Sequence, residues 1–200
     1  GNWGSRKHLM ASLEQSLKRM NLEYVDVFYS HRYDPETPLE ETLQTLVDIV
    51  HQGKALYVGL SKYPLEAYLF ASRFLKERDV PCLLYQGRYS MLVREPESQG
   101  ILQAVRENGA GFVAFSPLAQ GLLTNRYLHG IPEDSRIARG GFLKKEALTP
   151  EVLRKIQALN EHARLRGQSL AEMALAWLLK DASITSVLVG ASSVEQLGDS

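Results

Sequence analysis

The chain has 200 residues, with 23 Lys and Arg against 23 Asp and Glu, 44% hydrophobic and 23% charged residues, and one cysteine. This length predicts a single domain, residues 1–200, and the composition excludes collagen, coiled coil and a disordered chain. Zero net charge argues against a nucleic-acid partner, and no apolar run approaches the ~18 residues of a membrane span. Cys82 has no disulfide partner, and the five scattered histidines show no metal-ligand spacing. We therefore expect a cytoplasmic protein with no metal and no membrane segment.

Short and almost continuously apolar runs recur along the chain and predict parallel strands that are covered on both faces. They comprise residues 24–30, 55–60, 82–86, 111–115 and 186–189. The first four begin 27 to 31 residues apart, which is the length of one strand-loop-helix-loop repeat. Alternating strands and helices predict an α/β fold with right-handed crossovers. Both a doubly wound sheet and a (β/α)₈ barrel fit this pattern.

Helical periodicity and helix-end signals fill the intervals between these runs. A stripe around Leu13 precedes the first strand, and residues 118–149 form a long aperiodic stretch that we expect to be a functional loop. The signals that start or stop the other helices are a capping box from Thr37 to Glu40, Gly53, Pro64, Gly109, Thr149 with Pro150, and Ser169 with Glu172.

Polar residues stand at or directly after the carboxyl end of every predicted strand, for example His31, Ser61, Gln86, Ser116 and Ser192. In barrels and in open α/β sheets the functional site lies at these strand ends. A polar side chain in a loop is ordinary taken alone, but five successive cases predict the rim of a small-molecule site.

The segments that contain these strand ends resemble the aldo-keto reductase superfamily. They read VDVFYSHR followed by DPETP, GKALYVGLS, AFSPLAQG, and GAS followed by EQL. The similar branch is the one shared by bacterial L-glyceraldehyde 3-phosphate reductases and the β subunits of voltage-gated potassium channels. The resemblance implies an NADP(H)-dependent (β/α)₈ TIM barrel, of which this chain supplies strands four to eight, about the last five βα units. On this interpretation residues 1–200 are a fragment and a partial oxidoreductase domain.

The resemblance also implies a reaction, the reversible NADPH-dependent reduction of small aldehydes or ketones to alcohols by hydride transfer. Glyceraldehyde 3-phosphate and methylglyoxal-like compounds are the substrates that it suggests. His31 matches the family histidine that helps to orient the substrate carbonyl. The tyrosine acid of the family, with its lysine and aspartate, belongs to earlier strands and has no counterpart here. We therefore expect the 200 residues alone to lack activity.

Cofactor-binding positions follow from the same resemblance, motif by motif. Ser61, Lys62 and Gln86 match residues around the nicotinamide, and Phe115 takes the place of an aromatic ring that stacks on it. The loop on the pyrophosphate side corresponds to Ser116, Pro117, Leu118, Ala119 and Gln120, and the basic residues that close over the phosphates to Arg126 and Arg136. The adenosine-phosphate site corresponds to Gly190, Ser192, Gln196, Asp199 and Ser200, although the nearest relatives favour Glu and Asn at the last two positions.

One alternative from another functional class remains open. A regulatory potassium-channel β subunit would use the cofactor as a sensor while it binds its partner. Channel subunits tend to carry Asn where this chain has His31, so this residue favours the enzyme. The sequence leaves open whether the protein forms a homo-oligomer.

Overall fold

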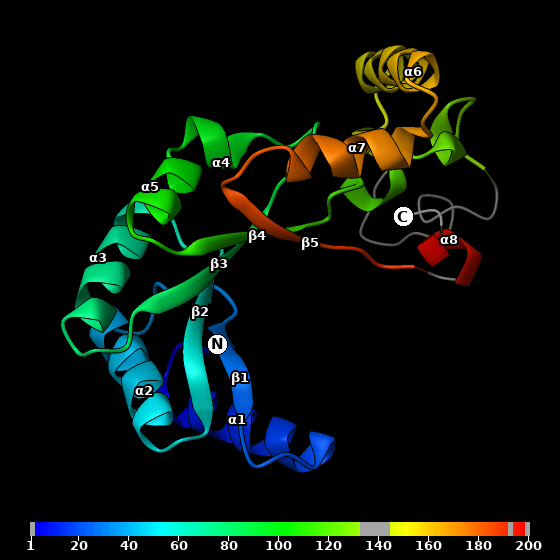
Figure 1. Ribbon diagram of the computed structural model, residues 1–200. Coiled ribbons are helices and arrows are strands. Elements are labelled where there is room, and N and C mark those ends of the chain that lie inside the picture. The colour runs from blue at the N-terminus through cyan, green and yellow to red at the C-terminus, as the bar shows by residue number, and fades with distance from the viewer. Residues whose placement is uncertain (1–2, 133–144, 192–193, 199–200) are drawn as a thin grey trace. The chain divides into compact units, whose positions relative to one another are not determined.

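The computed structural model describes residues 3–132, 145–191 and 194–198 (Figure 1). Its strands are β1 (Val25–Ser30), β2 (Ala55–Ser61), β3 (Cys82–Arg88), β4 (Gly111–Phe115) and β5 (Ile184–Leu188). The α-helices are α1 (Arg6–Met20), α2 (Leu39–His51), α3 (Leu65–Lys76), α4 (Glu95–Ser98), α5 (Ile101–Glu107), α6 (Pro150–Leu165), α7 (Leu170–Leu179) and α8 (Val194–Gly198). The described residues also form three short 3₁₀ helices, which are η1 (Ala119–Gly121), η2 (Asn125–Tyr127) and η3 (Lys145–Ala147).

The strand order decides between the two folds that the sequence pattern allows. The five strands are neighbours in the order β1-β2-β3-β4-β5, and the β1–β2 and β2–β3 pairs are parallel. A doubly wound sheet reverses its strand order at a switch point, whereas a barrel adds each new strand on the same side of the last. The described strands show no reversal, so the fold is that of a (β/α)₈ barrel with five of its strands present.

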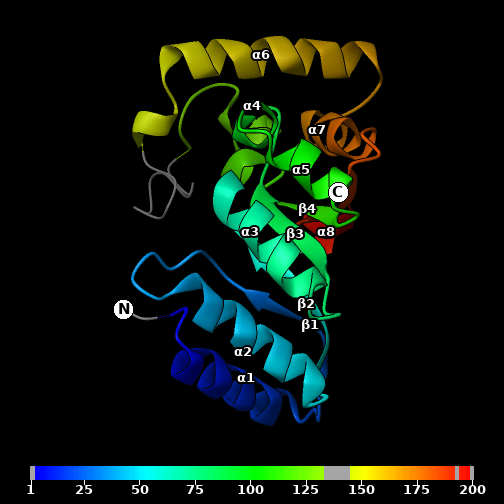
Figure 2. The same ribbon diagram turned by 90° about the vertical axis from the view of Figure 1, so that its left-hand side faces the viewer.

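The chain divides into two compact units, of which the first comprises Gly1–Gly87 and Glu95–Val113. Helices α1, α2 and α3 follow one another along this unit, and Figure 2 shows α1 and α2 side by side. Leu43, Leu46 and Ile49 form the buried stripe of α2, and Val58 and Leu60 of β2 are equally buried. Burial of apolar side chains between helix and strand is the main stabilising term of such a layer.

The second unit comprises Arg88–Arg94 and Ala114–Ser200. Its core contains Leu123, Tyr127, Ile156 and Leu170, all fully buried, and α6 packs beside α7. Trp177 of α7 packs against the ring of Tyr89 with 5.5 Å between ring centroids. The described part of the predicted long loop contributes Leu123 and Tyr127 to this core, and η1, η2 and η3 give it local structure.

The structure confirms most of the predicted helix ends and corrects one of them. Ser169 and Glu172 form the predicted capping box, and the Thr149 hydroxyl accepts from the N–H of Val152 at the start of α6. Thr37 does not cap α2, because Pro38 is the N-cap residue and makes no side-chain cap bond. The Thr37 hydroxyl instead donates to the buried carboxylate of Asp34 at 2.8 Å.

The predicted strands all exist, but several of their bounds differ from the apolar runs. Strand β2 includes Ser61, β3 continues to Arg88, and β5 runs two residues earlier than the predicted 186–189. Polar residues can continue a strand because backbone pairing does not depend on side-chain polarity. No helix in the described part of the chain is long and apolar enough to cross a membrane.

We expect the 200-residue chain to associate with itself. Large apolar side chains are exposed on its strands, among them Leu56 at 47%, and the strand order leaves β1 and β5 at the ends of the described sheet. Exposed apolar surface and free strand edges both promote association.

Size-exclusion chromatography with light scattering should give a mass above 22.4 kDa. Leu56→Lys with Leu83→Lys should shift it toward the monomer, whereas Leu165→Lys at the end of α6 should not. A monomer with a sharp thermal transition would refute this expectation.

Candidate active site

His31 directly follows β1, at the carboxyl end of the strand. Partial desolvation lowers the pKa of its imidazole, and the positive charges of Lys62 and Arg32 lower it further. An imidazole with a pKa below its ordinary value of about 6.5 is neutral at pH 7, and it keeps one N–H donor and one acceptor nitrogen. His31 is therefore equipped to donate a hydrogen bond to a neutral carbonyl oxygen.

Ser61, Lys62 and Gln86 meet at the carboxyl ends of β2 and β3. Ser61 lies opposite Gln86 in the parallel register, and the N–H of Lys62 donates to the carbonyl of Gln86 at 3.3 Å. Ser61 is 2% exposed, and its hydroxyl has no hydrogen-bond partner among the described residues. A buried hydroxyl without a partner costs about 1–3 kcal/mol, so this one is a natural contact for a bound polar group.

Lys62 leaves the strand with a φ of 55°, in the left-handed region. This conformation costs roughly 1–2 kcal/mol for a residue with a Cβ atom. Such strain is concentrated at sites where the surrounding structure holds the backbone for a purpose. Among the described residues, six non-glycine positions have positive φ, and four of them directly follow β2 or belong to the segment after β4: Lys62, Ser116, Ala119 and Gln120.

Tyr29 of β1 reaches Gln86 of β3 past Gly59 of β2, and the sequence analysis identified neither Tyr29 nor Gly59. The Tyr29 phenol hydrogen-bonds the side chain of Gln86, while burial raises the pKa of this phenol. A Cβ atom added to Gly59 would lie 2.4 Å from Cε1 of Tyr29, so only glycine leaves room for the ring. A glycine inside an apolar strand run was the available signal, because it often marks a close approach.

The turn after β4 carries the predicted pyrophosphate residues in the second unit. Phe115 ends the strand half-buried, and Ser116, Ala119 and Gln120 have φ values of 53°, 47° and 60°. Two 2.9 Å bonds close the turn, from the Ala119 N–H to the Ser116 carbonyl and from the Gly121 N–H to the Leu118 carbonyl. Residues in the left-handed region within a turn can direct backbone N–H groups to one side, which is a common way to bind anions.

The other predicted cofactor residues are only partly described. Arg126 lies exposed in η2, Gly190 follows β5, and Gln196 lies in α8. Arg136, Ser192, Asp199 and Ser200 lie outside the described residues. Within the first unit, the unsatisfied Ser61 hydroxyl offers a polar contact of the kind that a nicotinamide carboxamide needs.

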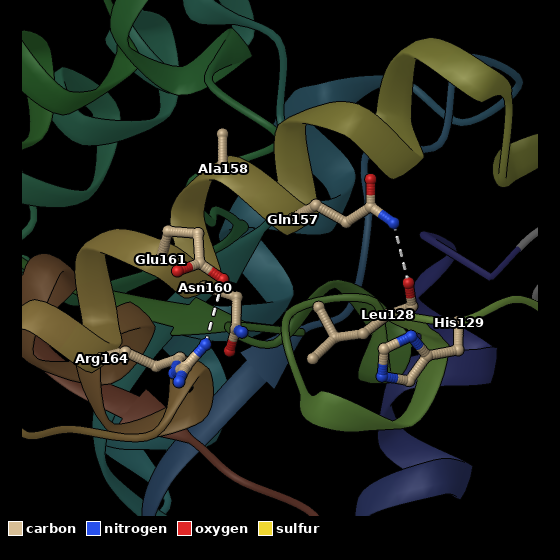
Figure 3. Close-up of a pocket in the computed structure, with 7 residues that line it drawn as sticks. All are labelled: Leu128, His129, Gln157, Ala158, Asn160, Glu161 and Arg164. Carbon is tan, nitrogen blue, oxygen red and sulfur yellow. Dashed lines mark hydrogen bonds and ion pairs between the residues drawn. The ribbon is translucent and has the colours of Figure 1, made fainter.

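A pocket of about 420 Å³ lies elsewhere in the second unit, between α6 and the segment after η2. Figure 3 shows its lining, in which the Gln157 amide donates to the Leu128 carbonyl at 2.9 Å and Arg164 faces Glu161. The pocket contains none of the predicted site residues. In the described ranges no group of three or more His, Cys, Asp and Glu side chains could hold a metal ion.

Comparison with known proteins agrees with this geometry. The sequence model of the Aldo/keto reductase family matches residues 2–200. The chain belongs to the aldo-keto reductase family. It is 54% identical over 202 residues to the L-glyceraldehyde 3-phosphate reductases of Escherichia coli O157:H7 and strain K12, covering 98% of this chain and 58% of each relative. It is also 36% identical to a probable voltage-gated potassium channel subunit beta of Arabidopsis thaliana, covering 96% of this chain and 60% of the relative.

A solved member of the family has the same fold. The thermostable aldo-keto reductase Tm1743, crystallised with the inhibitor epalrestat, superimposes with a TM-score of 0.74 at 29% identity. The match covers 98% of this chain and 60% of the solved one. This aldo-keto reductase chain therefore spans less than two thirds of the length of the relatives it matches.

We expect the charge environment of His31 to be measurable as a low imidazole pKa. An NMR titration of the His31 ring protons, in a full-length protein that contains this chain, should give a pKa below the ordinary 6.5. Lys62→Met should raise it, because a nearby positive charge disfavours the imidazolium. Lys7→Met on α1 is the matched control and should leave it unchanged. A His31 pKa at or above 6.5 in the unmodified protein would contradict this charge environment.

Proposed function

We propose that a full-length protein containing this chain reduces small aldehydes or ketones to alcohols with NADPH, reversibly. The observation that carries the proposal is the position of the His31 imidazole at the end of β1 in an aldo-keto reductase barrel, with the unsatisfied Ser61 hydroxyl at the end of β2. The 54% identity to L-glyceraldehyde 3-phosphate reductases supports a carbonyl substrate of similar size.

Hydride is the chemistry that a bound nicotinamide supplies to the carbonyl carbon. Ser61 and Gln86 would hold the carboxamide of that ring, and the Tyr29 hydrogen bond would fix the orientation of the Gln86 side chain. Phe115 would stack on the ring, and the turn at 116–121 with Arg126 and Arg136 would hold the phosphates. A fixed ring orientation matters because small misplacements of reacting atoms slow the step strongly.

His31 would donate its imidazole N–H to the carbonyl oxygen, where negative charge develops as the carbon–hydrogen bond forms. A preorganised donor of this kind stabilises the transition state more than the ground state. The oxygen must also gain a proton to become a hydroxyl. In this proposal the proton comes from a tyrosine on an earlier strand of the barrel, outside this chain.

A second candidate is a regulatory channel subunit, and the 36% identity to a probable potassium channel subunit beta favours it. Such a protein would bind the same cofactor, and slow turnover would be incidental to its role. The presence of His31, instead of the Asn that channel subunits tend to carry, supports the reductase. Steady turnover of an aldehyde by the full-length protein would distinguish the two.

We expect His31→Ala to lower kcat in the full-length protein far more than it weakens cofactor binding. Loss of one positioned donor to a developing oxyanion commonly costs ~10²–10³ in rate. Steady-state kinetics with glyceraldehyde 3-phosphate and fluorescence titration of NADPH measure the two effects separately. His8→Ala on α1 is a matched control that should change neither. Unchanged turnover by His31→Ala, with NADPH still bound, would assign His31 a structural role.

We also expect a preference for NADPH over NADH. Arg126 and Arg136 would contact the phosphates, and guanidinium groups bind phosphate in a bidentate manner. Replacing both by Ala should erode the preference chiefly through the KM for NADPH, measured as kcat/KM for the two cofactors. Arg106→Ala with Arg154→Ala removes the same charge from α5 and α6 as a control. Equal kcat/KM for NADPH and NADH in the unmodified protein would overturn the phosphate-site assignment.

A further inference from the structure

Arg32, the residue after His31, is held in an unusual position for an exposed arginine. Its guanidinium carbon lies 4.1 Å from the centroid of the Trp3 ring, so the cation rests on the face of the indole. Among the described residues Arg32 makes no hydrogen bond and no ion pair. The indole Nε1 of Trp3 is buried and also has no hydrogen-bond partner there. Arg32 and the Trp3 indole in contact with it thus each carry a donor group without an acceptor among the described residues, and Arg32 directly follows the candidate catalytic histidine.

The segment that carries Trp3 is fixed to the loop after β1 by a buried carboxylate. Asp34 is 4% exposed and accepts from the Gly4 N–H at 2.9 Å and from the Thr37 hydroxyl at 2.8 Å. The Thr42 hydroxyl donates to the Gly4 carbonyl at 2.7 Å. A Cβ atom on Gly4 would lie 2.8 Å from Asp34 Cβ and from Thr42 Oγ1, so the segment fits tightly. Trp3 and Arg32 are therefore placed against each other although 28 residues of sequence separate them.

Two cations lie near the imidazole of His31, and the carboxylate of Asp34 is engaged elsewhere. Arg32 and Lys62 both lower the pKa of His31, which places both cations near the imidazole. Asp34 does not neutralise Arg32, since its two oxygens accept from Gly4, Thr37 and Glu36. These bonds hold the pKa of Asp34 below its ordinary value. A guanidinium that is stacked on an aromatic ring and has no carboxylate partner keeps its donor edge available for a planar anion.

We propose that Arg32, seated on Trp3, binds the anionic group of the substrate, so that the protein prefers aldehydes that carry a phosphate. This inference rests on the proposed function, because it needs the substrate carbonyl at His31. Arg32 supplies charge-assisted hydrogen bonds to the phosphate, and the indole N–H of Trp3 supplies another donor at the same place. Tyr33, the residue after Arg32, packs edge to face with Tyr63 at 5.7 Å between centroids, and the Tyr63 hydroxyl is 2.8 Å from that of Ser30 at the end of β1.

The test compares glyceraldehyde 3-phosphate with glyceraldehyde in the full-length protein at pH 8, where His31 stays neutral in every variant. Arg32→Met should lower kcat/KM for the phosphorylated aldehyde roughly ten- to a hundredfold, and for glyceraldehyde less than threefold. Trp3→Phe keeps the aromatic face but removes the N–H, so it should give a smaller loss of the same selectivity. Arg78→Met is the matched control, because Arg78 lies 3.5 Å over the Phe74 ring at the other end of the strands.

A cofactor phosphate is the other source of such an anion, and NADPH affinity distinguishes the two. Arg32→Met should leave the dissociation constant of NADPH unchanged. An equal loss of kcat/KM for both aldehydes, or a loss of NADPH affinity, would overturn the proposal.

Binding of inorganic phosphate provides a readout that does not depend on turnover. Phosphate should shift the His31 ring signals in NMR, and this shift should disappear in Arg32→Met but not in Arg78→Met. Absence of any shift in the unmodified protein would overturn the anion site. Failure to reduce either aldehyde, with the phosphate shift intact, would instead overturn the proposed reductase function and leave the anion site standing.

Discussion

Parallel pairing of the strands in chain order is the constraint on which the candidate site depends. Because β1, β2 and β3 run in the same direction, their carboxyl ends lie at one edge of the first unit, where Ser30 pairs with Leu60 and Ser61 with Gln86. His31 follows β1 and Lys62 follows β2, so residues about 30 positions apart in sequence become neighbours. The helices stabilise this arrangement because they bury apolar side chains such as Leu43 and Ile49. Burial of one face of the sheet fixes the register of the strands.

Close contacts at a few small residues then fix the polar groups at that edge. Gly59 admits the Tyr29 ring, whose phenol holds Gln86, and Gly4 admits the Asp34 carboxylate, which holds the segment of Trp3. In each case one missing Cβ atom lets a larger side chain approach a backbone. The left-handed conformations of Lys62 and Ser116 add a second kind of constraint, since the folded structure must offset their cost. The strained residues at the strand ends thus lower the free energy of unfolding, and the buried apolar side chains behind them offset this loss.

The strand positions, the strand ends and the caps at Thr149 and Ser169 could be predicted from the sequence, because each depends on neighbouring residues only. Thr37 shows where this local reasoning fails. Its spacing to Glu40 is that of a capping box, but its hydroxyl donates to the buried carboxylate of Asp34 instead. A buried carboxylate without hydrogen-bond donors would cost more free energy than an uncapped helix end. The Tyr29–Gln86 hydrogen bond and the Trp3–Arg32 contact cannot be predicted from local sequence patterns, because they join distant parts of the chain. His31 could be found without the structure only because its motif resembles a family. Its lowered pKa depends first on partial burial and then on Lys62 across a strand pair, which the sequence does not predict, and only the contribution of Arg32 comes from a neighbour in sequence.

Two electrostatic effects oppose each other at the strand ends, and the positions of Arg32 and Lys62 bear on both. Positive charge attracts an anionic substrate, but an anion beside an imidazole raises the pKa of the imidazole and favours a charged histidine. A second cation offsets that effect, because Lys62 acts on His31 as well as Arg32 does. Stacking on Trp3 also holds the Arg32 charge at a defined place, where in the proposed site the phosphate would be its principal partner. In the proposed site, two cations beside His31 would therefore favour its neutral, hydrogen-bond-donating form more than a single arginine would while a dianion is bound nearby.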